Sequence, residues 1–137
     1  MASLLETFAD VFSGEAAQRG LSLLKGKENQ VIASEVVTII DDPLLDKGLA
    51  STPFDDEGVA SYTKTVVEKG VLKMFLHNQK SAAQMNTVST GNGFKAGYAG
   101  QVSISPTNFY IVPSETSYDE LLEKMGDGLV IDSLNGL

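Results

Sequence analysis

The sequence predicts an α+β domain: a mixed, largely antiparallel sheet with an N-terminal helical hairpin and a short capped helix near the C-terminus. Apolar residues recur at helical spacing over the first 25 positions, β-branched and aromatic runs bounded by turn formers follow, and a capping box marks a late helix. The chain has 137 residues, 42% of them hydrophobic, which is enough to bury a core. We expect residues 1–137 to form a single domain.

Two helices are predicted within the first 26 residues. The first rests on one apolar stripe with a period of about 3.6 residues, formed by Leu4, Leu5, Phe8, Val11 and Phe12. Ser13 is expected to cap the second helix, with Glu15 in its first turn, where the helix dipole favours a carboxylate. The buried face of this second helix is expected to be Ala17, Leu21 and Leu24, and its end Lys25-Gly26.

Three strands and a long loop are predicted next. Residues 36–40 are all β-branched, which favours a strand buried on both faces. Residues 44–58 contain turn formers without periodicity and are predicted to be a loop, and loops of this length are usually functional or disordered. Residues 59–68 and 71–77 are predicted to pair as a hairpin, because Gly70 supplies the positive φ of a short turn.

Short elements are predicted for the remainder of the chain. Asn78 is expected to cap a helix over residues 79–85, and residues 87–107 form a second irregular stretch with four glycines. Residues 109–112 are predicted to be a strand. Ser117 and Glu120 complete a capping box for a helix that ends at Gly126 and has Leu121, Leu122 and Met125 as its apolar face. Residues 128–134 are a last strand candidate.

Composition excludes several classes of function. Ten Lys and Arg against 18 Asp and Glu give a net charge of −8, and nucleic-acid binding requires a basic footprint, so we expect none. The chain has no Cys and a single His, His77, which rules out thiolate sites and any site that needs two imidazoles. We expect no membrane span and no signal peptide, and therefore a cytoplasmic protein.

Three features carry alternative chemical interpretations. His77 is either a general base or a polar residue that ends a strand. The acidic residues of the long loop either hold a hard cation or are solvated turn carboxylates; they are Asp55, Asp56 and Glu57, with Asp41, Asp42 and Asp46 upstream. The glycine-rich residues 91–97 only superficially match a phosphate loop, because the Gly-Lys-Ser/Thr ending is absent, and a mobile loop is the simpler interpretation.

Several motifs in the same order carry a resemblance to a known family. The first two are Thr-Ile-Ile-Asp-Asp-Pro at 38–43 and Leu-Ala-Ser-Thr-Pro-Phe-Asp-Asp-Glu-Gly at 49–58. Glu-Lys-Gly-Val-Leu at 68–72, Leu-His-Asn at 76–78 and Ser-Ala at 81–82 follow. Thr-Gly-Asn at 90–92, Pro-Thr-Asn-Phe-Tyr-Ile at 106–111 and Gly-Leu-Val-Ile at 128–131 complete the set. In these motifs the sequence resembles the TldD/PmbA family, modulators of DNA gyrase and predicted zinc peptidases.

The sequence departs from the catalytic branch of that family. In the TldD branch a His-Glu-x-x-x-His helix precedes the Asp-Asp-Pro strand, and here Met1 and Glu6 stand where its histidines would be. The resemblance is therefore to the PmbA branch, also called TldE, and implies no metal in this chain and zinc only in a TldD-type partner. Pro113-Ser114 also differs from a Pro-Gly of many relatives. Family members are several times longer, so we expect a fragment of the C-terminal half.

The resemblance implies a non-catalytic subunit of a TldD-type metallopeptidase complex that cleaves unstructured peptides, with a role in peptide maturation and in modulating inhibitors of DNA gyrase. The implied partners are a TldD-type catalytic subunit and a peptide substrate, and an exposed sheet edge favours self-association of the fragment. The alternative is a stand-alone acidic adaptor that binds gyrase or a toxin or antitoxin. The candidate peptide- or partner-binding loop residues are Phe54, Asp55, Asp56, Glu57, Gly58, Thr90, Gly91 and Asn92.

Overall fold

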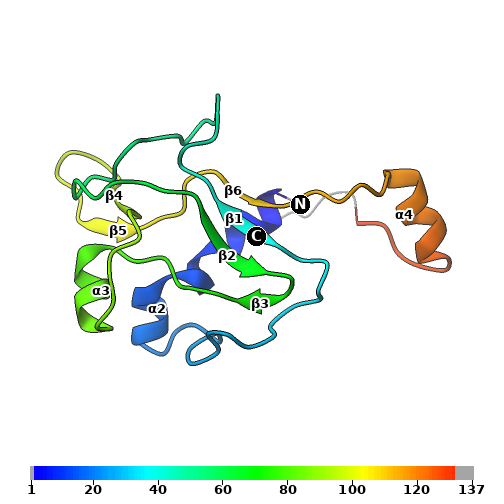
Figure 1. Cartoon of the computed structure of the whole chain (residues 1–137), viewed down its shortest axis with the longest axis horizontal. Coiled ribbons are helices and arrows are strands. Elements are labelled where there is room, and N and C mark those ends of the chain that lie inside the picture. Colours follow the sequence, from blue (N-terminus) through cyan, green and yellow to red (C-terminus); the bar gives the residue numbers. More distant parts are fainter. Residues whose placement is uncertain (1, 132–137) are drawn as a thin grey trace.

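The computed structural model describes residues 2–131, with side chains from residue 5 onward. Its helices are α1 (Ala2–Thr7), the 3₁₀ helix η1 (Ala9–Phe12), α2 (Gly14–Gln18), α3 (Gln79–Gln84) and α4 (Tyr118–Met125). Its strands are β1 (Ile39–Asp41), β2 (Lys64–Glu68), β3 (Val71–Leu72), β4 (Gly93–Lys95), β5 (Val102–Ile104) and β6 (Phe109–Ile111). The predicted α+β class, with antiparallel sheets and few helices, is confirmed (Figure 1).

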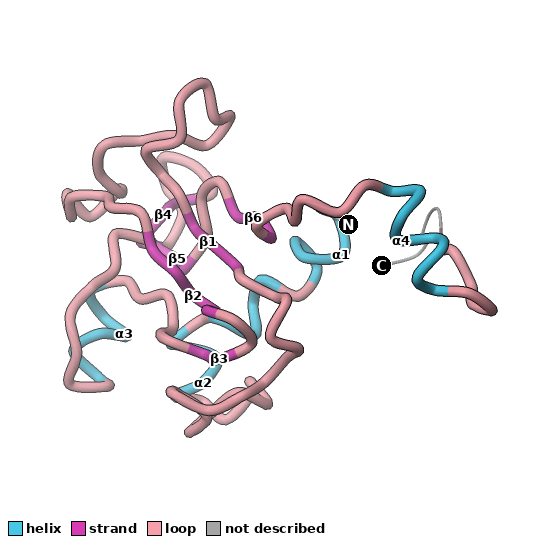
Figure 2. Tube along the Cα trace, turned by 45° about the vertical axis from the view of Figure 1, so that its right-hand side comes forward, coloured by secondary structure: helices cyan, strands magenta, loops and turns pink. Residues whose placement is uncertain are grey.

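Two antiparallel sheets form the centre of the molecule (Figure 2). The larger sheet has the strand order β3-β2-β1-β6, so two segments far apart in the sequence, β1 and β6, lie side by side. Ile40 pairs with Thr65 on one side and with Tyr110 on the other. The smaller sheet is the hairpin of β4 and β5. No helix among the described residues is long and apolar enough to cross a membrane.

The β2–β3 hairpin is confirmed, and its turn explains the sequence there. Val67 pairs with Leu72 and Glu68 with Val71, so the turn residues are Lys69 and Gly70. Both have positive φ, 46° and 78°, the geometry of a two-residue turn that matches strand twist. A Cβ on Gly70 would also overlap the Ala33 carbonyl oxygen. That close approach lets residues 29–33 cover the outer edge of β3, through hydrogen bonds such as Leu72 N–H to Gln30 O at 3.1 Å.

The core lies between the larger sheet and the N-terminal helices. Phe12 meets Phe109 of β6 edge-on, with 5.7 Å between ring centroids, a favourable aromatic geometry. Residues from η1, α2, the sheet and the segment after β3 complete the buried cluster: Ala17, Ile39, Val66, Val67, Leu72, Phe75 and Leu76. The sheet and the N-terminal helices therefore fold as one packed unit.

The N-terminal helical hairpin is shorter and more broken than predicted. Residues 2–12 form two separate short helices, and the second predicted helix ends at Gln18 rather than at Lys25. Gly20 has φ 74° and its N–H binds Ala17 O, while Leu21 N–H binds Ala16 O. This is a Schellman ending at the first glycine after the helix. Leu21 is consequently 70% exposed instead of buried. The Ser13 cap, Glu15 in the first turn and the burial of Ala17 are confirmed, and Leu24 is half-buried against the core.

The predicted strands are too long at their ends. Residues 36–38 lie outside β1, and Val36 is 80% exposed, because a turn closed by Val37 N–H to Ser34 O occupies that segment. Residues 59–63 and 73–77 likewise lie outside β2 and β3. The predicted loop at 44–58 contains no helix or strand.

Residues 87–107 are not a purely irregular stretch, because the β4–β5 hairpin lies within them. The predicted strand at 109–112 is confirmed as β6. Residues 128–131 form no strand, and residues 132–134 of that prediction lie outside the described part of the chain.

Two of the predicted helix caps are confirmed in the C-terminal half. Asn78 accepts from Ser81 N–H at the start of α3. Ser117 and Glu120 form both bonds of a capping box at the start of α4. Gly126 ends α4 as predicted, and no residue of this helix is buried, its apolar side chains Leu121 and Met125 included.

Candidate functional site

The two predicted loops lie against each other, and Asp55 joins them. Asp55 is only 2% exposed. Its Oδ1 accepts the N–H groups of Glu57 at 3.0 Å and Val59 at 2.9 Å, and its Oδ2 accepts the N–H of Gly93 at 2.9 Å. A carboxylate with three backbone donors closes its own turn and fixes the second loop at the same time.

The neighbouring acidic residues also bind backbone amides. Asp56 Oδ2 accepts Lys95 N–H at 2.7 Å, which holds the last residue of β4. Glu57 Oε2 accepts the N–H of Gln79 at 2.7 Å, at the first residue of α3. A Cβ on Gly93 would lie 2.5 Å from that same Glu57 oxygen. A side chain at position 93 would therefore displace the Glu57 carboxylate from its bond with Gln79.

A buried ion pair lies beneath the loops. Asp41, the last residue of β1, and Lys64, the first residue of β2, have fully buried side chains, with 3.2 Å between Oδ2 and Nζ. Asp41 Oδ1 accepts from Thr107 N–H at 2.6 Å and from Thr107 Oγ1 at 2.7 Å. Lys64 Nζ donates to Thr90 O at 3.2 Å and lies 4.9 Å from the ring centroid of Tyr62. Burial raises the pKa of the Tyr62 hydroxyl above its ordinary value.

Asn92 connects that ion pair to the second loop. Its Nδ2 donates to Asp41 Oδ2 at 2.8 Å and to Ser105 O at 3.0 Å. Its Oδ1 accepts from Thr90 Oγ1 at 2.7 Å. Thr90 Oγ1 in turn accepts the N–H of His77 at 2.7 Å. Thr90, Asn92, Asp41 and Lys64 thus form one continuous buried polar network, which fixes the geometry of both loops.

His77 is a buried structural residue of this network. It is 5% exposed, and its Nδ1 lies 3.1 Å from Ser81 Oγ in α3. A Cβ on Gly14 would overlap its ring, so α2 packs directly on the imidazole. Burial lowers the pKa of His77 below its ordinary value. A buried ring with one nitrogen already bonded has the surroundings of a packed core histidine rather than of a solvent-accessible general base.

The eight candidate loop residues divide into two groups. Asp55, Thr90, Gly91 and Asn92 are buried and hold the loops together. Phe54, Asp56 and Gly58 are exposed and Glu57 is half-buried, so these residues of the first loop are the ones that a peptide or a partner can contact. Phe54 is 59% exposed although its backbone bridges to Ala60. Their role in binding stays a prediction.

The donor set of this chain does not fit a hydrolytic zinc ion. Such a site takes three protein ligands, drawn mostly from His, Cys and carboxylates. The chain has one His and no Cys, and within residues 2–131 no three acidic or His side chains gather closely enough to hold a metal. Six acidic residues were candidates for a hard cation. Asp41, Asp55, Asp56 and Glu57 bind Lys64 or backbone amides. Asp42 accepts bonds from Leu44 N–H and Thr63 Oγ1, and Asp46 is exposed.

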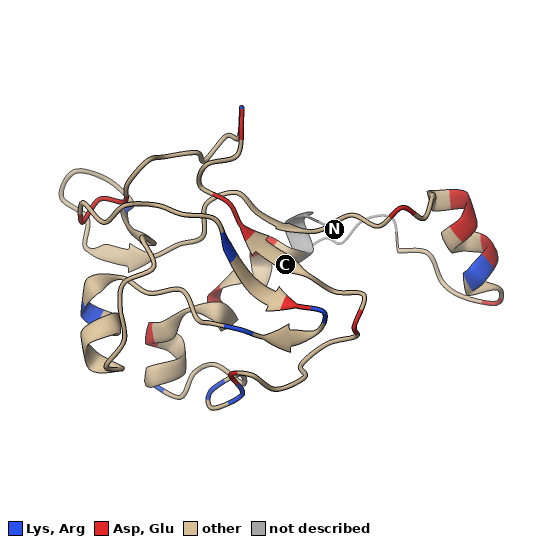
Figure 3. Ribbon diagram, viewed as in Figure 1, with Lys and Arg blue, Asp and Glu red and all other residues tan. Residues whose placement is uncertain are grey.

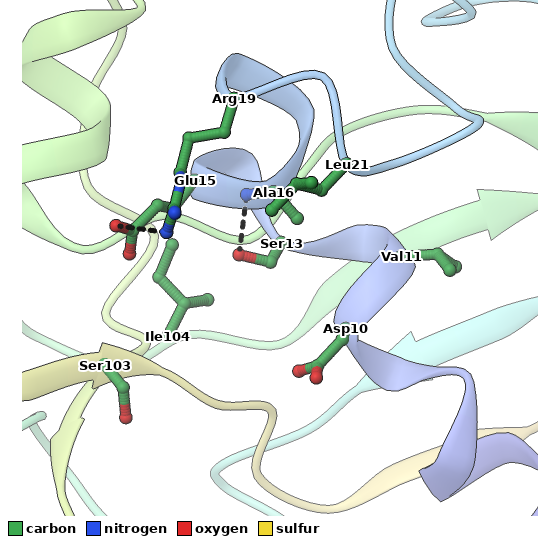
Figure 4. Close-up of a pocket in the computed structure, with 9 residues that line it drawn as sticks. All are labelled: Asp10, Val11, Ser13, Glu15, Ala16, Arg19, Leu21, Ser103 and Ile104. Atoms are coloured by element: carbon green, nitrogen blue, oxygen red, sulfur yellow. Dashed lines mark hydrogen bonds and ion pairs between the residues drawn. The ribbon is translucent and has the colours of Figure 1, made fainter.

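Two open cavities lie beside the N-terminal helices. One, of about 340 Å³, lies between α2 and β5. In it the Arg19 guanidinium extends along Glu15 above Ile104, and Asp10 lies at the opposite end (Figure 4). The second, of about 320 Å³, shares Asp10 and Ile104 with the first and continues along residues 105–107 to Glu6. The two cavities therefore meet at Asp10 and Ile104, and the second one reaches α1.

Sequence reasoning missed the most buried part of the site. Asp41 was interpreted either as a cation ligand or as a solvated turn carboxylate, and position 64 lay within a predicted strand, whereas Asp41 and Lys64 form the central ion pair. Side-chain alternation could have indicated that Lys64 is buried, because it places Lys64 on the same face of the strand as Val66, which is fully buried. Asn108 was also missed: its side chain binds Asp42 O and Ser51 Oγ and accepts Ala50 N–H, which anchors the first loop.

Comparisons with known proteins give one consistent result. The family model described as PmbA/TldA metallopeptidase C-terminal domain matches residues 1–137. The chain is 39% identical over 131 residues to a metalloprotease of Archaeoglobus fulgidus, covering 96% of this chain and 30% of the relative. It is 33% identical over 124 residues to metalloprotease PmbA of Escherichia coli O157:H7, covering 90% and 25%.

Solved structures agree with the sequence relatives. A Thermotoga maritima protein named for modulation of a DNA gyrase matches with a TM-score of 0.80 and 46% identity, over 89% of this chain and 27% of that one. TldE from Thermococcus kodakarensis matches with a TM-score of 0.77 and 33% identity, over 83% and 27%. The chain thus spans between 25% and 30% of the length of these four relatives.

Proposed function

Because this chain belongs to the PmbA/TldA metallopeptidase C-terminal domain family, we propose that it is part of the non-catalytic, PmbA/TldE-type subunit of a two-subunit peptidase. In this proposal a TldD-type subunit supplies the zinc and the hydrolytic chemistry, and the present chain shapes the space in which an unstructured peptide lies. The observation that carries the proposal is the donor set: one imidazole, buried and bonded to Ser81, and no thiol.

The position of α1 supports the same conclusion. The family resemblance places a metal-binding His-Glu-x-x-x-His helix where residues 1–6 lie, and residues 2–7 are indeed helical. Glu6, at the place of the second His, is exposed and lines the second cavity. A helix with that position but without imidazoles keeps the shape of the family site while lacking the nitrogen ligands for zinc.

Within residues 2–131 the outer edge of β6 pairs with no other strand, which supports the peptide part of the proposal. Asp42 N–H binds Asn108 O and Val112 N–H binds Thr38 O, so the backbone groups of Phe109 and Ile111, which alternate with these, point away from β1. Main-chain hydrogen bonding to a sheet edge holds peptides of varied sequence. The outer edge of β3 is covered by residues 29–33, which makes β6 the strand for such pairing.

Co-purification and metal analysis test the proposal. The protein is tagged in its own organism, or co-expressed with the TldD-type protein of that organism. We expect the two to purify together, zinc to be stoichiometric in the pair and substoichiometric in this subunit alone, and cleavage of an unstructured peptide to require both. A His77→Gln variant should leave the zinc content of the pair unchanged, because His77 is not expected to be a ligand.

Other outcomes overturn the assignment. Chelator-sensitive, stoichiometric zinc in this subunit alone contradicts a non-catalytic role. Purification with gyrase or a toxin, without a peptidase partner, favours the acidic adaptor instead. A cytoplasmic location is part of the proposal, and recovery of the protein in the membrane or exported fraction contradicts it.

A further inference from the structure

Three buried groups that together can form an amide bond meet beneath the two loops: the amine of Lys64, the carboxylate of Asp41 and the carboxamide of Asn92. Each of these residues is at most 1% exposed. Asp41 Oδ2 lies 3.2 Å from Lys64 Nζ and accepts from Asn92 Nδ2 at 2.8 Å. Because both nitrogens contact one oxygen atom, they lie within about 6 Å of each other. Figure 3 shows the basic start of β2 beside the acidic end of β1.

The Lys64 amine is held on the segment that carries Asn92. Its Nζ donates to Thr90 O at 3.2 Å, two residues before Asn92, and lies 4.9 Å from the ring centroid of Tyr62. An amine is a nucleophile only after it has lost its extra proton. Transfer of one proton from Lys64 Nζ to Asp41 Oδ2 supplies that neutral amine and removes two buried charges at once.

The Asn92 carboxamide is held as the group to be attacked. Its Oδ1 accepts from Thr90 Oγ1 at 2.7 Å, and such a donor stabilises the negative charge that develops on a carbonyl oxygen under attack. Its Nδ2 donates to Asp41 Oδ2 and, at 3.0 Å, to Ser105 O. The nitrogen that would leave therefore lies beside the group that can protonate it. Complete burial of this amide keeps out the water that would compete with an amine.

We propose that Lys64 and Asn92 form an isopeptide bond within the chain, with Asp41 carrying the protons. Lys64 Nζ, deprotonated by Asp41 Oδ2, attacks Asn92 Cγ and forms the new Nζ–Cγ bond. The Cγ–Nδ2 bond then breaks as Nδ2 takes up, through Asp41, the two protons that Nζ gives up. An ammonium ion leaves, Asp41 is again a carboxylate, and nothing is oxidised or reduced. Fixed positions of all three groups favour this reaction over its counterpart in solution.

The bond joins the two sheets covalently. Lys64 is the first residue of β2 in the larger sheet, and Asn92 immediately precedes β4 in the smaller one. A covalent loop between these positions restricts the unfolded chain, so the linked form should unfold at a higher temperature than the unlinked form. The ion pair is the state from which the reaction starts. The inference goes beyond the proposed peptidase role and does not depend on it, because it needs neither zinc nor a peptide.

Mass spectrometry gives a direct test. The mass of the denatured protein is measured when freshly purified and after prolonged incubation of the folded protein at neutral pH. We expect a mass that is lower by one ammonia than that of the sequence. Trypsin should then fail to cleave after Lys64, and residues 48–69 should be recovered joined to residues 81–95. An unchanged mass in both samples, with residues 48–64 and 81–95 recovered separately, overturns the proposal.

Two substitutions separate the reacting lysine from any other lysine. Lys64→Arg keeps a positive charge opposite Asp41, but a guanidinium stays protonated and does not attack, so this variant should show no loss of mass. The matched control is Lys73→Arg, at a half-exposed lysine that pairs with Glu68, and it should keep both the loss of ammonia and the joined peptides. Circular dichroism checks that both variants fold. A loss of ammonia that persists in Lys64→Arg overturns the proposal, and the peptide map of the unmodified protein decides if that variant does not fold.

The same peptide map distinguishes two competing reactions. A succinimide formed by Asn92 with the following nitrogen also loses ammonia, but it joins no second peptide and leaves Lys64 open to trypsin. An amide formed directly between Lys64 and Asp41 loses water instead, and joins residues 48–69 to residues 28–47. Either product in place of the expected one overturns the assignment of Asn92 as the partner of Lys64.

Discussion

The Asp41–Lys64 pair shows how one buried residue depends on another. Both side chains are fully buried, with 3.2 Å between Lys64 Nζ and Asp41 Oδ2. Asp41 also accepts two bonds from Thr107 and one from Asn92. Taking two charges out of water is costly, and a buried pair is offset by its mutual attraction only when such bonds complete it. Removal of one partner therefore leaves the other as an uncompensated charge.

Replacing Lys64 by Met should strongly destabilise the protein. We expect the free energy of unfolding to fall by about 3–5 kcal/mol, since Asp41 stays buried without its cation. The matched control is Lys73→Met, whose pair with Glu68 is half-exposed and should be worth no more than about 1 kcal/mol. Urea unfolding followed by circular dichroism measures both, and equal effects of the two substitutions would contradict the structural role of Lys64.

His77 should make stability depend on pH. Burial lowers its pKa in the folded protein below the ordinary value of 6.5, so between the two values the unfolded chain binds the proton and the folded chain does not. Stability is therefore complete above about pH 6.5 and falls as the pH drops below it. Unfolding midpoints at several pH values between 7.5 and 5 measure this slope. The His77→Gln variant should show a flatter dependence of stability on pH over the same interval. A dependence equal to that of the unmodified protein would contradict the prediction.

At the scale of elements, helix starts were predicted more reliably than helix and strand ends, although Gly126 ends α4 as predicted. Ser13, Asn78 and Ser117 cap their helices as their sequence context predicts, because a cap is a local bond between near neighbours. The Schellman ending at Gly20 removed Leu21 from the core, although Gly26 looked like an equally good stop. Sequence gave no means of choosing between two glycines, since packing further away decides which one ends the helix.

The strands show the same limit: a local turn could be predicted, but the lengths of the strands could not. The β2–β3 turn was predicted from Gly70, a local feature, whereas the length of β1 was overestimated because its β-branched run continues past the point where pairing stops. The β4–β5 hairpin was missed because its strands are three residues long and lie among glycines. Of the site, the resemblance indicated the two loops, but the pairing of Asp41 with Lys64 joins strands far apart in the sequence.

The α4 cap should be pH-dependent and independent of the rest of the fold. The Ser117 backbone N–H, and secondly its hydroxyl, bind the Glu120 carboxylate and hold its pKa below the ordinary value of 4.5. Because the folded pKa is the lower one, the cap is fully formed above 4.5 and is lost as the pH falls through the folded value. NMR shifts of the α4 amides should report this loss. In Glu120→Gln, which retains a capping-box side chain, the same shifts should vary less with pH, and equal variation would refute the mechanism.

At the scale of the whole molecule, the two sheets are joined mainly through side chains. Asp55 and Asp56 bind the β4 strand from the first loop, and Asn92 ties the start of that strand to Asp41 in the larger sheet. Since Glu57 also holds the start of α3, a single loop connects three elements. The relative position of the sheets therefore depends on these side-chain bonds as well as on the packing of Ile104 of β5 against the core.

Replacing Asp55 by Ala should loosen this connection without abolishing the core. The N–H groups of Glu57, Val59 and Gly93 lose their acceptor, which should cost about 1–3 kcal/mol for each group that stays buried and unpaired. Hydrogen exchange should be faster at these amides than in the unmodified protein, while the amides of β2 should exchange as slowly as before. Asp46→Ala, an exposed residue of the same loop, is the control, and identical exchange in the two variants would argue against the connection.

The clamp on Asn92 and Gly93 also protects the chain chemically. An asparagine followed by glycine loses its amide when the glycine nitrogen attacks the side-chain carbonyl, a reaction that needs a mobile backbone and a free nitrogen. Here the Gly93 nitrogen is held by Asp55, and the Asn92 amide is fully buried between Asp41 and Ser105. Deamidation of Asn92 therefore requires that this part of the chain unfolds. The aspartate and isoaspartate forms should accumulate in stored protein only in molecules that have unfolded there.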